Sequence, residues 1–399
     1  MDIIYYGLAC DEEFLQERLK RDPSPYIVAQ QAFETALLEQ LQTYSDVTLN
    51  CHYIPQETSQ LRFISSHMAE LPSGIKIRFL SCLNLPFIKF IWLFFATFFR
   101  TLHLVLTKRQ KQTILLHAVN YFPVSLANYV VCKLFHLKNI CIFTDSTAFL
   151  TLEDRISQMS PLKRKIMPLY IKAVKKLEAC FSGYIFFAQP MDNVINVRRS
   201  PSIVMEGIFN PQGLNLEPVP KKRAIMYGGS LFRQYGIMTF IDAFRQIDAP
   251  DLKLWIFGSG ELEKEIQAIS EQDPRVQYKG FCSRHELFEY EKSATLLINT
   301  RSSKDIYTRL SFPSKTFEYM VSGTPFLTTK IGGIPEEYYP YLFVTEGETP
   351  SEIKKSIESI LSLSDEEREQ FGLRARSFIL QNKNASKQTE KVYHFLKII

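Results

Sequence analysis

Residues 298–327 read INTRSSKDIYTRLSFPSKTFEYMVSGTPFL, and this stretch decides the fold class. It begins at the end of an apolar run that predicts a strand, and it has helical apolar spacing from Ser314 to Gly323. Pro313 before the helix and Gly323 just past its end are typical start and stop signals. Because residues 325–333 predict another buried strand, the stretch has the strand, helix and strand order of a parallel α/β sheet.

The same alternation extends over the whole chain and divides it into two halves. Strands are predicted in the first half at 1–8, 46–54, 76–83, 113–119, 139–145 and 184–189, with helices at 26–44, 123–137 and 160–181. Residues 211–223 contain three prolines and a glycine and predict a linker, after which a second alternating series begins. We therefore expect an α/β protein of two Rossmann-like halves.

The composition of the 399 residues is that of an ordinary folded protein, with 46% hydrophobic and 22% charged residues. The seven cysteines are scattered and contain no C-x-x-C pair, which argues against a disulfide framework or a cysteine zinc site and fits a reducing cytosol. The N-terminus turns acidic at Asp11, Glu12 and Glu13, where a signal peptide would have its apolar region. We therefore expect no export.

Three glycine turns follow predicted strands in the second half, at 228–230 (GGS), 258–260 (GSG) and 332–333 (GG). In a parallel sheet such turns lie at the edge where ligands bind, and exposed backbone N–H groups beside a helix N-terminus suit a phosphate. A single glycine turn is equally typical of a tight structural turn. Three of them on one domain favour a nucleotide site.

Lys315 and Glu318 lie in the first turn of the helix that follows Pro313 and Ser314. A cation at a helix N-terminus is electrostatically unfavourable unless it serves an anion, and a diphosphate would be such an anion. Glu318 could accept two hydrogen bonds from the vicinal hydroxyls of a ribose. The alternative is a surface ion pair between residues i and i+3, worth ~0.2–0.5 kcal/mol.

At these residues the second half resembles the retaining glycosyltransferases of GT-B fold, in family 4 and its relatives, many of which assemble polysaccharides. The matching segments lie in order over residues 220–345 and are MYGGSLFRQYGIMTFIDAF, LWIFGSGELEKEI, VQYKGF, SFPSKTFEYMVSGTPFLTT and IGGIPEEY. The first half is similar to the family only at Gly7, His117 and the Phe-Thr-Asp of 143–145.

The resemblance implies two Rossmann-like domains that face each other across a cleft. It implies an acceptor-binding domain over 1–210, a linker over 211–223, a nucleotide-sugar domain over 224–375, and a C-terminal helix over 376–399 that packs back on the first domain. It also implies a retaining reaction in which the leaving diphosphate is stabilised electrostatically. The expected catalytic residues are His117, Arg233 and Lys315. The expected donor-binding residues are Gly229, Ser230, Arg233, Gly258, Lys315, Thr316 and Glu318. His117 and, less directly, Gly7, Asp145, Asp305 and Ser311 are candidates for contacts with the donor sugar or the acceptor.

The chain departs from the family pattern at two places. The common Glu-x7-Glu signature would have its first acid at position 310, which is Leu310, so that role is empty or is filled by Asp305 or Ser311. In the first glycine turn Arg233 is the only cation, and Tyr235 stands where lysine is frequent. No D-x-D motif and no clustered His and Asp set is present, so we expect neither a metal nor another cofactor.

The first half also has a basic and aromatic region. Residues 60–176 hold 17 basic and 4 acidic residues. The uncharged run 90–99, bracketed by Lys89 and Arg100, is too short to span a bilayer and predicts either a core helix or a helix lying in the bilayer interface. The segment 160–181 is either a solvated helix or one that binds an anionic leaflet. The expected membrane-facing residues are Phe90, Trp92, Phe94, Lys163, Arg164, Lys165, Lys172, Lys175 and Lys176.

The sequence therefore predicts a cytoplasmic glycosyltransferase on the inner face of the membrane, extending a lipid-linked saccharide for capsule, exopolysaccharide or another surface glycan. Nucleic acid is not an expected partner, because no helix-turn-helix, zinc finger or RNP-like motif accompanies the basic residues. Two alternatives remain. One is a GT-B-fold sugar-nucleotide epimerase, and the other is a catalytically silent subunit that binds a partner enzyme, which the leucine at 310 favours.

Overall fold

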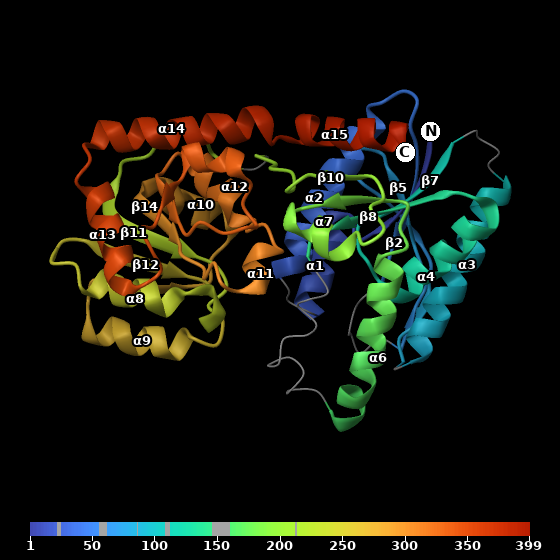
Figure 1. Cartoon of the computed structure of the whole chain (residues 1–399), viewed down its shortest axis with the longest axis horizontal. Helices are drawn as coiled ribbons and strands as arrows, with labels where there is room; N and C mark the ends of the chain where they lie inside the picture. The colour runs from blue at the N-terminus through green and yellow to red at the C-terminus, as the bar shows by residue number, and fades with distance from the viewer. Residues whose placement is uncertain (22–24, 56–61, 86, 108–111, 146–159, 212–213) are drawn as a thin grey trace. The chain divides into compact units, whose positions relative to one another are not determined.

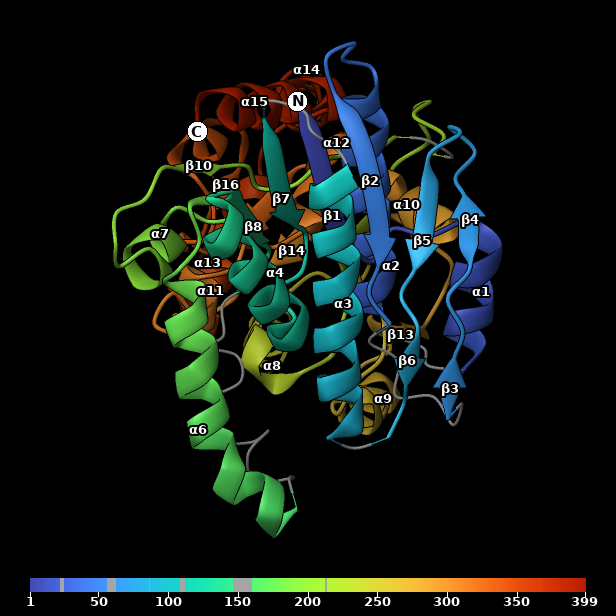
Figure 2. The same cartoon turned by 90° about the vertical axis from the view of Figure 1, so that its right-hand side faces the viewer.

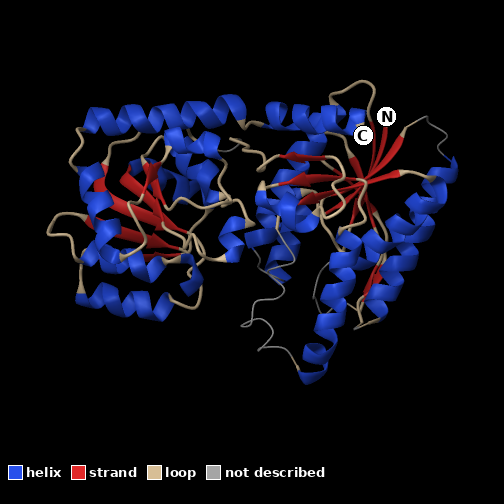
Figure 3. Ribbon diagram, in the orientation of Figure 1, coloured by secondary structure: helices blue, strands red, loops and turns tan. Residues whose placement is uncertain are grey.

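The computed structural model describes the chain except residues 22–24, 56–61, 86, 108–111, 146–159 and 212–213, and it divides into two compact units. The first unit is Met1–Asn210 together with Ala385–Ile399, and the second is Pro211–Asn384. Each unit is a largely parallel sheet covered by helices (Figures 1 and 3).

The sheet of the first unit has eight strands in the order β10-β9-β8-β7-β1-β2-β5-β4, and all its pairs are parallel except β4 with β5. A further short antiparallel pair joins β3 to β6. The strands are β1 (Asp2–Gly7), β2 (Thr48–Tyr53), β3 (Phe63–Ile64), β4 (Met68–Glu70), β5 (Lys76–Phe79), β6 (Cys82–Leu83), β7 (Thr113–His117), β8 (Lys138–Phe143), β9 (Gly183–Phe186) and β10 (Ser202–Val204).

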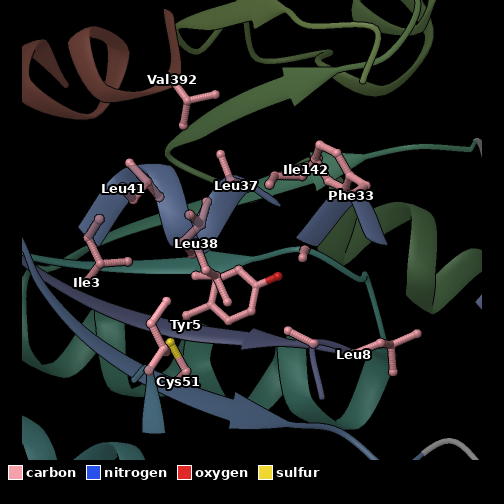
Figure 4. Close-up of a cluster of buried hydrophobic side chains, with 14 of the residues drawn as sticks. Ile3, Tyr5, Leu8, Phe33, Leu37, Leu38, Leu41, Cys51, Ile142 and Val392 are labelled. Carbon is pink, nitrogen blue, oxygen red and sulfur yellow. The ribbon is translucent and has the colours of Figure 1, made fainter. Parts of the chain in front are cut away.

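Helices cover both faces of this sheet, because successive strand side chains point to opposite sides. Ile3 and Tyr5 of β1 pack with α2 and α15 in one core cluster, which includes Leu37 and Val392 (Figure 4). Ile4 of the same strand packs on the other face with α3 and α4 (Figure 2). The helices of the unit are α1 (Glu12–Arg21), α2 (Pro25–Gln42), α3 (Ile88–Thr107), α4 (Phe122–Phe135), α6 (Pro161–Glu178), α7 (Pro190–Ile195) and α15 (Ala385–Ile398).

The sheet of the second unit has six parallel strands in the order β13-β12-β11-β14-β15-β16. Its strands are β11 (Lys222–Gly228), β12 (Lys253–Phe257), β13 (Val276–Gly280), β14 (Ala294–Asn299), β15 (Phe326–Thr328) and β16 (Phe343–Val344). Its helices are η2 (Arg233–Tyr235), α8 (Ile237–Arg245), α9 (Glu263–Gln272), α10 (Arg284–Ser293), α11 (Ile306–Arg309), α12 (Lys315–Ser322), η3 (Glu336–Tyr341), α13 (Pro350–Leu361) and α14 (Asp365–Asn382).

The end of the chain differs in detail from the boundary at 375 expected from the sequence. Helix α14 runs from Asp365 to Asn382 and belongs to the second unit, so only α15, from Ala385, packs on the first unit. Ser364 begins α14 with a capping box, in which its hydroxyl accepts from the backbone N–H of Glu367. The sequence contains no helix-ending signal at residue 375, so α14 continues to Asn382.

Candidate functional site: the carboxyl edge of the second sheet

The site is built from loops at the carboxyl ends of β11 and β12, beside the N-terminus of α12. The backbone N–H of Gly229 donates to the carbonyl of Phe257 at 2.9 Å, and the N–H of Leu231 donates to the carbonyl of Ser259 at 2.9 Å. A hydrogen bond connects α12 to the same loops: the Gly228 N–H donates to the hydroxyl of Tyr319, on α12, at 2.8 Å. Two predicted glycine turns and the predicted helix start therefore lie together.

Glycine is required at this point for steric reasons. Gly258 has φ +124°, and a Cβ on it would overlap the carbonyl oxygen of Gly229. A Cβ on Gly229 would in turn overlap the side chain of Lys315. The close approach of the two loops and of the Lys315 stem is thus possible only because neither turn has side chains there.

Lys315 is the first residue of α12, and its side chain lies over Gly229 with Nζ 5.8 Å from the centre of the Tyr227 ring. Burial lowers the pKa of its ammonium from the ordinary value, and Glu318 and Glu291 act in the opposite direction. Within the described ranges Lys315 has no ion pair. A cation without an ion pair at a helix N-terminus, over a glycine turn, is arranged to receive an anion.

Glu318 does not form the alternative ion pair with Lys315. Its Oε1 accepts from the Nε of Arg284, on α10, at 2.8 Å. The carboxylate is only partly exposed, with 30% of its side chain accessible. Arg284 thus orients Glu318, and Glu318 forms no ion pair with Lys315.

Two charged residues near Lys315 were not predicted from the sequence. Glu291, on α10, is fully buried, and burial together with the charge on Glu318 raises the pKa of its carboxyl well above the usual range. Arg301 follows β14, and its Cζ lies 4.5 Å from the centre of the Tyr235 ring. Since β14 pairs with β11, the rule that ligands meet strand carboxyl ends could have found Arg301. No sequence signal marks Glu291 as buried.

Arg233 lies in η2, and its side chain is more exposed than expected for a residue that binds the donor diphosphate. Its Nη2 donates to Glu265 of α9 at 2.5 Å, and its backbone N–H donates to Glu261 at 2.7 Å. Its side chain is 62% exposed. The structure therefore pairs Arg233 with α9 and shows no contact between Arg233 and Lys315.

The remaining predicted residues of this unit fall into two groups. Ser230 lies in the first glycine turn, where its carbonyl accepts from the Tyr227 hydroxyl at 3.0 Å, and Thr316 is fully buried in α12 with its hydroxyl unpaired. Asp305 precedes α11, and Ser311 follows it. Leu310, where the family pattern has an acid, is only 2% exposed, so a buried apolar side chain occupies that position.

The predicted residues of the first unit lie at the carboxyl edge of its own sheet. Gly7 ends β1, His117 ends the neighbouring β7, and Asp145 is exposed just after β8. His117 is fully buried between the rings of Tyr6 and Phe181, and burial lowers its pKa to about 4. The roles of these three residues stay predictions.

Comparison with known proteins agrees with this geometry. Residues 215–378 match the family described as "Glycosyl transferases group 1". The segment covers the site described above but less than half of the chain. The predicted enzyme class, a glycosyltransferase, is confirmed by this match together with the fold.

Several solved structures have a similar fold over almost the whole length of the chain. Anabaena HepE in complex with UDP has 12% identity and a TM-score of 0.64 over 100% of both chains. Sucrose-phosphate synthase from Thermosynechococcus elongatus has 15% identity and a TM-score of 0.64 over 100% of this chain and 99% of its own. Trehalose 6-phosphate synthase from Burkholderia multivorans has 11% identity and a TM-score of 0.65, over 100% and 96%. The predicted GT-B fold is thereby confirmed, and no curated protein sequence matches the chain.

Proposed function

We propose that the protein transfers a sugar from a nucleoside diphosphate sugar to a lipid-linked saccharide, as a retaining, metal-independent enzyme related to family 4. The observation that carries the proposal is the unpaired Lys315 at the N-terminus of α12, packed against the glycine turn at 229. Anabaena HepE was solved in complex with UDP, which supports a nucleotide donor for this fold.

In this proposal each part of the site acts on a different part of the donor. Lys315, at the N-terminus of α12 and over the glycine turn at 229, would neutralise the diphosphate as its bond to the sugar breaks. Glu318, held by Arg284, would accept hydrogen bonds from the ribose hydroxyls. Across the described ranges no three His, Cys, Asp or Glu side chains lie close enough to hold a metal ion. Metal independence itself stays a prediction.

The division of labour between Lys315 and Glu318 gives a binding prediction. Glu318→Ala should weaken the binding of a nucleoside diphosphate about tenfold or more, which is the scale of losing hydrogen bonds to a charged acceptor. The binding of inorganic pyrophosphate should not change, because pyrophosphate has no ribose. Isothermal titration with UDP, GDP, ADP and pyrophosphate measures both. Glu346→Ala, which removes an exposed carboxylate paired with Lys355, is the matched control. An equal loss for pyrophosphate and nucleotide would refute the ribose assignment.

A second function has one observation in its favour. The buried Leu310 leaves the first acid of the family pattern without a counterpart, as expected of a silent subunit that binds a partner enzyme. Incubation with a panel of nucleotide sugars, with and without a polyprenyl-linked saccharide, separates the alternatives. Transfer that requires the acceptor supports the proposal, isomerisation of the donor alone supports an epimerase, and the absence of turnover supports the silent subunit.

The outward face of α3 supports a membrane location for this reaction. Ile91, Phe95 and Phe99, spaced four residues apart on one face, are 60%, 50% and 61% exposed. The opposite, buried face has Leu93 and Leu104 as well as Thr97 and Thr101, and the Thr101 hydroxyl donates to Asn128 at 2.6 Å. A helix on a water-exposed surface has polar residues on its outer face, whereas the outer face of α3 is apolar as well.

Arg100 ends the uncharged run of 90–99 but not the helix, which continues to Thr107. Its Nε donates to the Nε2 of His52 on β2 at 3.0 Å, so its charged group turns toward the sheet. Burial and the Arg100 charge lower the pKa of His52 to about 3, which keeps the ring neutral and able to accept. Helix α3 is therefore 20 residues long, and among the described residues it alone has the length and composition to cross a bilayer.

We propose that α3 lies in the plane of the bilayer interface of an anionic, cytoplasmic leaflet, because its inner side is held by hydrogen bonds of Arg100 and Thr101 with β1, β2 and α4. Helix α6 supplies the electrostatic attraction. Its exposed cations are Lys163, Arg164, Lys165, Lys172, Lys175 and Lys176. The two helices are linked through Phe90 and Tyr170, whose ring centres are 6.3 Å apart.

Replacing the six α6 cations with glutamine should abolish the salt-sensitive part of binding to anionic liposomes. Each cation near such a surface contributes about 1 kcal/mol, and the Debye length falls to ~3 Å at 1 M salt. Vesicle sedimentation at low and high salt measures the effect. A variant with six other exposed lysines replaced (Lys264, Lys279, Lys330, Lys355, Lys387 and Lys391) has the same net charge and is the control. Equal loss in both variants would mean that net charge alone, and not α6, determines binding.

A further inference from the structure

Glu34 on α2 is a fully buried carboxylate that holds the loop after β1. Its Oε2 accepts from the backbone N–H of Leu8 at 2.5 Å, from the N–H of Ala9 at 2.9 Å and from the Tyr5 hydroxyl at 2.6 Å. A Cβ on Gly7 would overlap this oxygen, so the loop passes close to the carboxylate only because residue 7 is glycine. Three donors from one short segment thus converge on one oxygen.

The other carboxylate oxygen connects the loop to the neighbouring strand. Gln30, one turn earlier on α2, donates from Nε2 to Glu34 Oε1 at 2.8 Å and to the carbonyl of Ala118 at 3.1 Å. Ala118 directly follows β7, next to His117, and β7 is paired with β1. One carboxylate therefore ties together the carboxyl ends of two adjacent strands.

Among the residues that the structure describes, no cation pairs with this carboxylate. The titratable groups that face it are Tyr5 of β1, Cys10 of the loop and Cys51 of β2, none of which carries a positive charge. Burial raises the pKa of Glu34 to about 7, although the hydrogen bonds from Tyr5, Gln30 and the two amides act in the opposite direction. Its protonation therefore changes close to neutral pH.

We propose that Glu34 is a positioning residue whose charge state sets the conformation of residues 7–10 and, through Gln30, of the end of β7. The proposal rests on the proposed function together with the sequence-based prediction that Gly7 and His117 contact the donor sugar or the acceptor. Protonation falls on Oε1, which has the single donor Gln30. The new O–H must then donate to Gln30, so the Gln30 amide turns its oxygen toward Glu34 and its N–H away from Ala118. The loop loses a charged acceptor in the same step.

Backbone amide exchange at Leu8 and Ala9 tests this without any activity. After correction for intrinsic exchange, we expect protection to fall about tenfold from pH 8 to pH 6 in the intact protein, as a charge-assisted hydrogen bond becomes a neutral one. Glu34→Gln should lack this change. Gln30→Met, which removes a donor that lowers the pKa of Glu34, should move the midpoint to higher pH. Glu39→Gln, on the same helix, is the control and should leave the midpoint where it is.

The fall of kcat/KM at acid pH should show the same pattern among the variants as amide exchange does. It should be absent in Glu34→Gln and should have a higher midpoint pH in Gln30→Met. A purely structural role for Glu34 would change stability in both variants but would not move a midpoint. Unchanged protection across pH in the intact protein, or an unmoved midpoint in Gln30→Met, overturns the proposal. If exchange responds as expected and no sugar is transferred, the positioning role stands and the proposed reaction fails.

Discussion

Lys315→Ala is expected to lower sugar transfer by a factor of ~10²–10³, the scale of removing one preorganised donor from a developing charge. The effect should be large because Lys315 lies at a helix N-terminus, over a turn without side chains, and has no ion pair within the described residues to share its charge. Binding of inorganic pyrophosphate should weaken as well, since the interaction is with phosphate and not with the ribose. Turnover with a saturating nucleotide sugar and titration with pyrophosphate measure the two effects.

The comparison needs a variant that keeps the shape of the site. Lys315→Met retains the apolar stem over Gly229 and removes only the ammonium, so it should lose activity to the same degree as alanine. Lys330→Met, at an exposed cation of the same unit paired with Glu336, should remain fully active. Wild-type turnover in Lys315→Met would show that the stem and not the charge matters, and the anion site would be wrongly assigned.

The triple variant Ile91→Ser, Phe95→Ser, Phe99→Ser is expected to weaken membrane binding by about two orders of magnitude. Full burial of one such side chain is worth ~1.5–3 kcal/mol, and these three are each half or more exposed, so about 1 kcal/mol each is available to the bilayer. The loss should appear in the part of liposome binding that survives high salt, which distinguishes it from the effect of the α6 cations. Fluorescence of Trp92, on the same helix, should no longer shift on addition of vesicles.

Apolar residues exposed elsewhere in the first unit provide the control. Val194, Val197 and Ile398 are 53%, 66% and 82% exposed and lie outside α3, so their replacement by serine should leave vesicle binding unchanged. The α3 variant should also gain solubility in the absence of lipid, because a large exposed apolar patch is removed. If both triple variants bind vesicles as the wild type does, α3 does not face the membrane.

The second half was predictable from sequence because its signals are local. Glycines that follow short apolar runs and a proline before an amphipathic helix identify the strand ends and the start of α12 without any tertiary information. The placement of Lys315 over Gly229 follows from these signals and the parallel order of the strands. Arg301 was within reach of the same argument, because it also follows a strand that neighbours β11.

What the sequence could not provide is the burial of individual polar side chains. Glu34 lies in a helix that has one other charged residue, Glu39, and Glu291 lies in a helix rich in charges, yet both carboxyls are buried. The apolar periodicity of a helix indicates on which face of the helix a residue lies, but it does not show whether another element covers that face. His117, at the end of β7, was expected near the substrate. In the structure its ring is fully buried and contacts the rings of Tyr6 and Phe181.

The return of α15 to the first unit has a consequence for biosynthesis. Val392 and Leu396 are fully buried in the same cluster as Ile3 and Leu37. The core of the first unit, whose N-terminal strands are synthesised first, is therefore complete only after α15 has been synthesised. At ~5–20 residues per second, the ribosome needs roughly 10–35 s to add the intervening second unit. During that interval the α2 face of the first unit is open to chaperones, and a ribosome that stalls after residue 384 would release a chain whose second unit is whole and whose first is not.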